Sequence, residues 1–231
     1  AVELSYTRQA ATGQRATGGQ PMVTIGSTVM PADELAWQLD QQIKQVARDV
    51  EKTFITGKYQ KPDDNTKPRR TRGLIEAVTT NRTATTHTAA DLTDDDVLDL
   101  MQKVWDNGGI RVSETRTVIV GAKLKRALTR AFIKEKNYKE ESRNIAGVNL
   151  KTFETDFGSC NIMLNRYMPA DTLVVVSLDE LYPAFLEIPD KGHFFAEPLA
   201  KTGASDKVQL YGEIGLRYGN ERAHGILTVT T

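Results

Sequence analysis

Cysteine, net charge and long apolar runs are all scarce in this sequence. Cys160 is the only cysteine among 231 residues, so no disulfide can form within the chain, and a reducing folding compartment is the natural interpretation. Lysine and arginine together number 30, and so do aspartate and glutamate. Proteins whose main task is to bind nucleic acid usually carry a basic excess, so this balance argues against a dedicated DNA-binding module.

Targeting segments are also missing. No apolar segment approaches the roughly 18 to 20 residues that a membrane span requires. The opening residues, AVELSYTRQAATGQ, have neither the basic nor the apolar region of a signal peptide. The chain begins with Ala1 and not with methionine, and we interpret it as processed or truncated. Its 39% hydrophobic and 26% charged residues are ordinary for a globular protein and exclude a disordered chain or a coiled coil.

The sequence contains no recognisable motif for catalysis or metal binding. His87, His193 and His224 do not have metal-ligand spacing, and we interpret all three as structural, with His87 in an exposed Thr-rich loop. Cys160 has no adjacent basic residue to lower its thiol pKa and heads an apolar strand, which favours a packed core cysteine. GxSxG, P-loop and GxGxxG patterns are absent, and Ala200–Gly203 is interpreted as a turn. We therefore expect no catalytic residue, no metal and no cofactor.

Hydrophobic spacing predicts one long helix near the N-terminus. Pro31 would open it, and Asp33 and Glu34 in its first turn would complement the helix dipole. Apolar residues recur every three or four positions as far as Gly57, the predicted C-cap. This apolar stripe consists of Leu35, Leu39, Ile43, Val46, Val50 and Phe54. Residues 1–30 are rich in Gly, Thr and Gln, with strand-like stretches at 2–6 and 22–25 and a Gly-rich turn at 13–19, and they predict an arm.

The middle of the chain alternates helix and strand, which predicts a mixed α/β block. Residues 57–72 are polar and interrupted by proline, so they predict an exposed loop. A second helix follows the N-cap residue Thr93, and the acidic run Asp94–Asp96 fits its first turn better than a metal site. The apolar positions of this helix are Val97, Leu100, Met101, Val104 and Trp105, and the next helix carries Leu124, Leu128, Ala131 and Phe132 on one face. The predicted strands are 117–120, 150–155, 161–164 and 173–176.

The C-terminal section has a different pattern. Apolar and polar residues alternate from Val208 to Tyr218, which predicts one long strand with a buried face and a solvent or partner face. A turn at Gly219–Asn220 and a last strand at 226–229 follow.

The run from Phe195 to Gly225, FAEPLAKTGASDKVQLYGEIGLRYGNERAHG, resembles the closing segment of a family of tailed-bacteriophage (or prophage) major capsid proteins. LAKTGASDKVQLYGEIGL is its most specific part. Matching pieces lie upstream in the family's order, namely Leu35–Ala36, Val104–Gly109, Asp156–Gly158 and Asn165–Arg166. The resemblance implies an α+β chain with the HK97-like fold, which spans residues 1–231.

This resemblance implies a domain organisation. Residues 1–30 would be what is left of the extended loop, and residues 31–89 would form the peripheral domain, with the helix from Pro31 to Ile55 as its spine. Residues 90–185 would form the axial domain, and 186–231 would return to the peripheral domain as long β-strands. The family also normally carries an N-terminal arm and the rising half of the extended loop before the position of Ala1, and these are absent here.

The implied function is a non-enzymatic one: a head protein that self-assembles into pentamers and hexamers, forming the icosahedral shell around the phage genome. The implied partners are other copies of the chain, the enclosed double-stranded DNA in non-specific contact at most, and portal, scaffold or protease, and decoration proteins, with no membrane. Assembly would take place in the bacterial cytoplasm and the product would be the virion capsid. Some relatives join subunits by a lysine–asparagine bond, but no lysine precedes Lys44, so we predict no such crosslink from this segment.

Charged residues in the arm, the loop and the terminal section are the interface candidates, because complementary charges fix the register between subunits. The basic cluster at 67–72 could also touch DNA phosphates, although a solvated loop or pairing with a neighbour's acids is favoured. The residues that we expect at subunit interfaces are Glu3, Tyr6, Arg8, Lys58, Lys67, Arg69, Arg70, Arg72, Lys201, Glu213, Arg217 and Glu221.

Three alternatives stay open at this point. An encapsulin-type nanocompartment shell would keep the fold and change the cargo from DNA to an enzyme. A small α/β enzyme with an unrecognised site would need converging catalytic groups, and the scattered histidines and lone cysteine supply none. A DNA-binding module is disfavoured by the charge balance.

Overall fold

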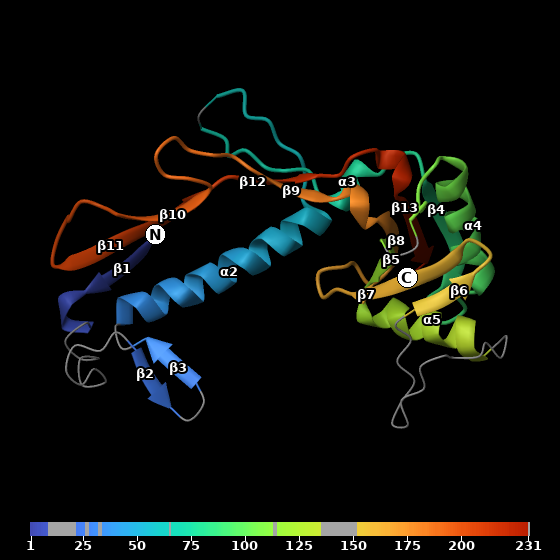
Figure 1. The fold of residues 1–231 in the computed structure, drawn as a ribbon, viewed down its shortest axis with the longest axis horizontal. Coiled ribbons are helices and arrows are strands. Elements are labelled where there is room, and N and C mark those ends of the chain that lie inside the picture. The colour runs from blue at the N-terminus through green and yellow to red at the C-terminus, as the bar shows by residue number, and fades with distance from the viewer. Residues whose placement is uncertain are drawn as a thin grey trace. The chain divides into compact units, whose positions relative to one another are not determined.

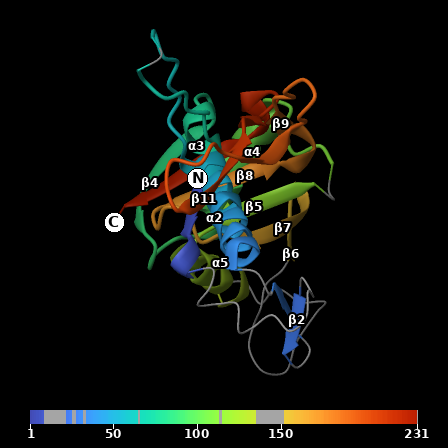
Figure 2. The ribbon, with the colours of Figure 1, turned by 90° about the vertical axis from the view of Figure 1, so that its left-hand side faces the viewer.

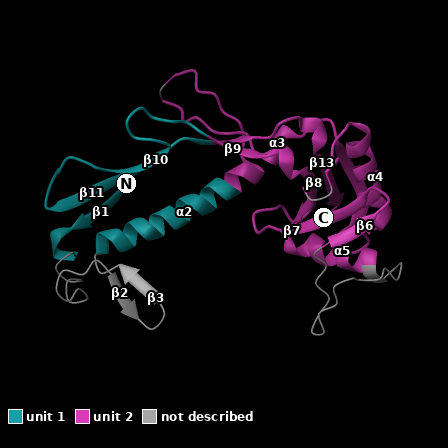
Figure 3. Ribbon diagram, viewed as in Figure 1, with its two compact units in different colours: residues 1–51, 185–214 teal, residues 52–184, 215–231 magenta. Residues whose placement is uncertain are grey.

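The computed structural model describes residues 1–8, 22–25, 28–31, 34–64, 66–112, 115–134 and 152–230. The chain forms two compact units, shown in teal and magenta in Figure 3. The first comprises residues 1–51 and 185–214, and the second comprises residues 52–184 and 215–231. The second unit therefore holds almost all of the predicted 90–185 block, together with the segments before and after it.

A six-stranded mixed sheet organises the second unit (Figure 1). Its strands, in spatial order, are β4 (Arg82–Thr88), β13 (Gly225–Thr230), β8 (Thr172–Ser177), β5 (Arg116–Val120), β7 (Gly158–Leu164) and β6 (Thr152–Thr155). The β4–β13 and β5–β7 pairs are parallel and the other pairs are antiparallel. Strands β5 and β8 are buried along their whole length, which is why they read as continuous apolar runs in the sequence.

Helices cover both faces of this sheet. On one face, α4 (Asp94–Asp106) and α5 (Ala122–Lys134) pack against the odd-numbered side chains of β8, Leu173 and Val175. On the other face, Val174 and Val176 pack with α3 (Leu74–Ala77) and with Ile55. The alternation of side chains along each strand thus divides the core into two apolar layers.

Most predictions for this unit are confirmed. Thr93 and Asp96 form a capping box at the start of α4, which explains the acidic run by helix capping. The apolar positions of α4 and α5 named from the sequence are buried, with one exception. Trp105 is 47% exposed. Its ring contacts only the edge of the core, 6.3 Å from the ring of Phe157, because position 105 lies one residue beyond the buried stripe that ends at Val104.

Strand β4 was missed by the sequence interpretation. The Thr-rich segment around His87 was predicted to be a loop, but residues 82–88 form an edge strand that pairs in parallel with β13. Threonine is β-branched and favours extended backbone, so the signal was present in the composition of the segment.

The first unit contains a three-stranded antiparallel sheet in the order β1 (Val2–Ser5), β11 (Ser205–Gly212), β10 (Phe194–Pro198). The predicted strand at 2–6 therefore ends one residue early, at Ser5. The predicted strand at 22–25 is confirmed as β2 (Met22–Ile25), which pairs with β3 (Thr28–Pro31). The predicted Gly-rich turn at 13–19 lies outside the described residues.

The long helix is confirmed as α2 (Glu34–Thr56), but its predicted start was wrong. Pro31 does not open the helix; it is the last residue of β3, paired with Met22. Proline is tolerated at a strand end because it lacks only the backbone N–H. Asp33, predicted in the first turn, lies outside the described residues.

The predicted strand from Val208 to Tyr218 is two strands. β11 ends at Gly212, and β12 (Ile214–Arg217) pairs with β9 (Tyr182–Phe185) in a separate two-stranded sheet. A Cβ at position 212 would lie 2.8 Å from the Phe194 ring, so glycine here permits close approach of β10 and interrupts the strand. The side chains of β11 are partly buried on both faces, so the predicted division into a buried and an exposed face was also wrong.

Candidate subunit interfaces

An exposed network of charges lies on the three-stranded sheet of the first unit. Glu3 accepts a hydrogen bond from the Ser205 hydroxyl at 2.8 Å and pairs with Lys207 at 3.2 Å. Lys201 donates to the Tyr6 hydroxyl at 2.9 Å and pairs with Asp206 at 2.9 Å. These contacts from Tyr6 and Asp206 raise the pKa of the Lys201 ammonium. The predicted candidates Glu3, Tyr6 and Lys201 are thus brought together on one surface.

Arg8 lies apart from that network. Its guanidinium pairs with Glu34, in the first turn of α2, at 3.2 Å. This contact links the residues that follow β1 to the beginning of α2. The Arg8 guanidinium is therefore at least partly neutralised within the chain.

The segment 57–73, called the basic arm below, begins and ends beside the same helix end. The Gly73 amide donates to the Gly57 carbonyl at 3.0 Å, and Gln60 and Arg70 exchange two backbone hydrogen bonds of 3.1 and 3.0 Å. The Arg72 guanidinium lies 5.1 Å from the centre of the Tyr59 ring and donates to the Tyr218 hydroxyl at 3.2 Å. The predicted loop is therefore a hairpin with a fixed base, and Arg72 belongs to that base.

The outer part of the basic arm carries the other predicted cations. Lys58, Lys67, Arg69 and Arg70 are all exposed. The tip turn is held by Asp64, which accepts hydrogen bonds from the Thr66 amide at 2.9 Å and the Thr66 hydroxyl at 2.5 Å. These hydrogen bonds lower the pKa of the Asp64 carboxyl, so this acid is committed to the turn.

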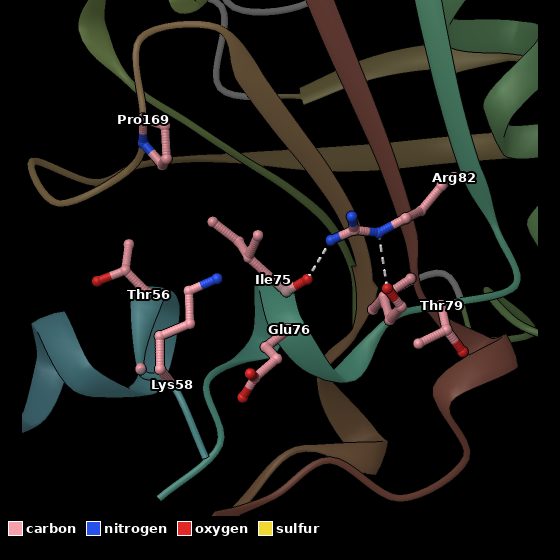
Figure 4. A pocket seen from close by; sticks show the side chains of 9 residues that line it. Thr56, Lys58, Ile75, Glu76, Thr79, Arg82 and Pro169 are labelled. Atoms are coloured by element: carbon pink, nitrogen blue, oxygen red, sulfur yellow. Dashed lines mark hydrogen bonds between the residues drawn. The ribbon is translucent and has the colours of Figure 1, made fainter. Parts of the chain in front are cut away.

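A cavity of about 540 Å³ lies in the second unit beside the base of the arm (Figure 4). The Arg82 guanidinium closes one side by donating to the carbonyls of Ile75 and Val78, the latter at 2.9 Å. The Glu76 carboxylate accepts the Tyr59 amide hydrogen at 2.6 Å. The described lining of the cavity contains neither histidine nor cysteine. Of its three charged residues, Arg82 and Glu76 hydrogen-bond to the backbone of the chain, and Lys58 is exposed.

Glu221, an interface candidate from the sequence, instead organises the turn before β13. Its carboxylate accepts hydrogen bonds from the Thr79 and Thr80 amides at 2.9 and 3.1 Å and from the Thr80 hydroxyl at 2.5 Å. Partial burial raises the pKa of Glu221, but these hydrogen bonds outweigh it and lower that pKa to about 2. The carboxylate is therefore ionised at neutral pH and used within the chain.

The remaining candidates lie on separate strands or turns. Glu213, between β11 and β12, accepts a hydrogen bond from the Tyr211 hydroxyl at 2.8 Å. Arg217, at the end of β12, is exposed. The structure does not gather the twelve predicted residues into one site; it distributes them over several surfaces, as expected for a protein with several neighbours.

Two buried polar side chains are structural, as predicted. His224 is fully buried; its Nδ1 accepts the Ser177 amide hydrogen at 3.3 Å and its Nε2 lies 2.9 Å from the Tyr218 carbonyl. Cys160 is buried, and burial raises the pKa of its thiol to about 12 despite the nearby charge of Arg116. His87, in contrast, is exposed, with Nδ1 2.8 Å from Asp96. The described residues include no cluster of three or more His, Cys, Asp or Glu suited to a metal ion.

The sequence predicted the apolar stripe of α2 but not how far the chain itself covers it. Ile55 is the one fully buried residue among the described side chains of this helix. Trp37 is 36% exposed and Ile43 is 45% exposed. Periodicity predicts that a helix has an apolar face, but it does not say which molecule covers that face. None of the described helices is long and apolar enough to cross a membrane.

A family model described as "SU10 major capsid protein" matches residues 1–231. The chain belongs to this family. It is a major capsid protein of the tailed-phage type, and its role is to form a shell. No curated protein sequence matches this capsid protein.

Solved shell proteins share the fold of this capsid protein. The SrpI encapsulin of Synechococcus elongatus PCC 7942 aligns with a TM-score of 0.61 at 12% identity, over 98% of this chain and 71% of that chain. The capsid of Myoviridae phage XM1 aligns with a TM-score of 0.58 at 11% identity, over 99% and 71%. The capsid of an empty GTA particle aligns at 0.58 and 14% identity, over 86% and 67%. These matches confirm the predicted HK97-like fold.

Proposed function

We propose that this capsid protein closes into rings of five and six copies, which join into an icosahedral shell around double-stranded DNA. Heterologous contacts that repeat around a rotation axis generate such rings. In this proposal residues 90–185 form the axial domain, residues 31–89 and 186–231 form the peripheral domain, and residues 1–30 belong to the extended loop. Assembly takes place in the bacterial cytoplasm, and the portal, scaffold or protease, and decoration proteins are further partners.

The observation that carries this proposal is the incompletely covered apolar stripe of α2. This helix of 23 residues has one fully buried side chain among those described; Ile43 of the stripe is exposed, and the other five stripe residues are only partly buried. Burying apolar surface is worth about 25 cal/mol per Å², so association of copies that covers this face is favourable. The formal net charge of zero limits repulsion when many copies are packed together.

The predicted interface residues fall into two groups in this proposal: those that contact other copies, and those whose charged groups are hydrogen-bonded within the chain. The charge network on the first unit's sheet and the outer part of the basic arm supply contacts between copies. Arg72 and Glu221 support these surfaces from within the chain, since their charged groups are already hydrogen-bonded. The other proposed contact residues are Glu3, Tyr6, Arg8, Lys58, Lys67, Arg69, Arg70, Lys201, Glu213 and Arg217.

Electron microscopy of the complete gene product tests the proposal. We expect closed, hollow particles, and we expect deletion of residues 1–20 to prevent their formation. A product that stays monomeric at high concentration would contradict the proposal. We expect no lysine–asparagine crosslink from residues 1–43, because this segment contains no lysine; a ladder of covalent oligomers formed through residues 1–43 on a denaturing gel of the particles would contradict that part.

An encapsulin-type shell is the second candidate, because the SrpI encapsulin shares the fold. The cargo discriminates between the two functions. Particles purified with nuclease-protected double-stranded DNA support the phage shell, whereas particles that enclose a co-expressed enzyme and no DNA support the nanocompartment.

A further inference from the structure

The basic arm presents a group of positive charges that no other described residue neutralises. Between Gly57 and Gly73 the sequence has six basic residues and two aspartates. Arg72 contacts Tyr59, Tyr218 and Glu76 at the base, and Asp64 is committed to the tip turn. Within the described residues, the side chains of Lys61, Lys67 and Arg70 form no ion pair, and all three are exposed. The arm therefore offers at least three cations to a partner outside the chain.

The hydrogen bonds at its base preorganise the basic arm for binding. The hydrogen bonds between Gly73 and Gly57 and between Gln60 and Arg70 define the hairpin before any partner is present. Ordering a segment in advance lowers the entropic cost of binding. A preordered hairpin of this kind can bind a partner surface that is itself rigid.

A surface of the opposite sign lies on α4 of the same unit. The segment from Asp91 to Asp106 has six aspartates and one lysine. Asp96 is used by the capping box and by His87, and Asp94 is buried. Asp95, Asp99 and Asp106 are exposed and form no ion pair with another described residue.

The spacing of these three aspartates forms a line. Residues separated by four and by seven positions share one face of a helix, so Asp95, Asp99 and Asp106 lie along one side of α4. At 1.5 Å per residue, the line is about 16 Å long. This acidic face, defined as these three residues, is on a helix whose opposite side is locked into the core by Val97, Leu100 and Val104.

We propose that the basic arm of one copy binds the acidic face of α4 of the next copy in the ring. The inference rests on the proposed function and names the two surfaces that meet. Each copy carries one arm and one acidic face, so the contact is heterologous and every surface in a closed ring is used. The contact sets register between neighbours, because exposed charge pairs contribute mainly specificity and association rate.

A second copy fits the arm better than DNA does. The arm includes Asp63 and Asp64, which repel phosphates, and the formal net charge of the chain is zero. Pairing arm with acidic face neutralises both surfaces at once, whereas DNA in the arm would leave the carboxylates of α4 uncompensated in every copy.

Reciprocal charge reversal tests the contact in the complete gene product. The first variant combines Lys67→Glu with Arg70→Glu, and the second combines Asp95→Lys with Asp99→Lys. We expect each to lower the yield of particles about tenfold, the loss that a few weakened charge pairs per interface produce, and the quadruple variant to restore most of it. Lys123→Glu with Arg126→Glu, two exposed residues of α5, is the control with the same charge change and should assemble normally.

The other outcomes separate the inference from the proposed function. Failure of the unaltered protein to form particles contradicts the proposed function itself. Normal particles from both reversed variants, or no rescue in the quadruple variant, overturn the inference alone. Normal assembly with loss of DNA retention in the arm variant would assign the arm to nucleic acid. If a reversed variant does not fold by circular dichroism, Lys67→Gln with Arg70→Gln gives the same test, with an intermediate loss expected and no loss contradicting it.

Discussion

Two helices of this capsid protein, α2 and α4, have similar apolar stripes in the sequence and opposite environments in the structure. In α4, Val97, Leu100, Met101 and Val104 are completely buried against the six-stranded sheet. In α2, which is almost twice as long, one described side chain is fully buried. The same 3.6-residue periodicity therefore accompanies a helix that belongs to the chain's own core and a helix whose apolar stripe the chain covers only in part.

In the proposed function, this difference means that the chain divides its apolar surface between folding and assembly. The second unit has two apolar layers around its sheet and the properties of an independent domain core. The first unit has a three-stranded sheet with Val2 and Leu4 as its buried apolar residues, which is small for independent stability. We expect substitutions in α4 to act on folding and substitutions in α2 to act on assembly.

The largest expected effect on the free energy of unfolding is in α4, the buried helix of the two. Leu100→Ala should lower the free energy of unfolding by about 3 kcal/mol, because Leu100 is completely buried and its truncation leaves a cavity. Urea denaturation of the dissociated chain measures the change. Gln102→Ala, an exposed position of the same helix, is the control and should change the free energy little. An equal effect of both substitutions would mean that α4 is not packed as described.

Acid should act next on the packed unit, through His224. Burial lowers the pKa of His224, although the Tyr218 carbonyl and the carboxylates of Glu180, Asp179 and Glu221 oppose this shift. The unfolded chain therefore binds a proton more readily below pH of about 6.5. The stability that neutral His224 contributes is complete above that pH and is lost as the pH falls below it.

His224→Gln should cost about 2 kcal/mol at pH 8, since it disturbs a buried hydrogen-bonded group, and it should flatten the decline in stability between pH 7 and 5. Denaturation curves across this range measure both effects. His193→Gln, at an exposed position, should keep the decline of the unaltered chain. A decline of equal slope in the His224 variant would contradict the assignment.

A smaller effect is expected at the start of α4. Thr93→Ala removes the hydroxyl that accepts the Asp96 amide hydrogen, and N-cap losses of this kind cost about 1 kcal/mol. Thr93→Ser keeps an acceptor at the same place and should recover most of the loss. Thermal unfolding of both variants decides the point, and identical melting of the alanine and serine variants would contradict the capping role.

The smallest effect on stability should accompany the largest effect on assembly. Ile43→Ser on the exposed face of α2 should change the free energy of unfolding by no more than about 0.5 kcal/mol, while particle yield falls sharply. Lys44→Ser, an adjacent exposed residue outside the stripe, is the control for assembly. A loss of stability equal to that of Leu100→Ala would show that α2 is packed within its own chain.

Much of the second unit could be predicted from the sequence, because its signals are local. The cap at Thr93, the stripe of α4 and the apolar run of β8 all depend on neighbouring residues. The break at Gly212 could not be predicted, since it depends on the approach of Phe194 from another strand. The role of Glu221 was missed for the same reason: its partners Thr79 and Thr80 are more than 140 positions away.

The sequence identified the residues of the candidate interfaces by charge, but not their use. Lys67 and Arg70 are exposed, as predicted, whereas Arg72 turns back to the Tyr59 ring and the Tyr218 hydroxyl. Whether a surface charge is satisfied within the chain depends on side chains that only the fold brings near. Periodicity likewise predicted α2 and its stripe, but it does not say which molecule covers that stripe.

Hydrogen exchange of the complete gene product, before and after assembly, tests most directly whether other copies cover α2. Amides of residues 38–51 should become at least about tenfold more protected in particles, because covering the apolar face suppresses local opening of the helix, while amides of residues 97–104 in α4 should exchange at the same rate in both states. Equal protection of residues 38–51 in the dissociated chain and in particles would contradict the account.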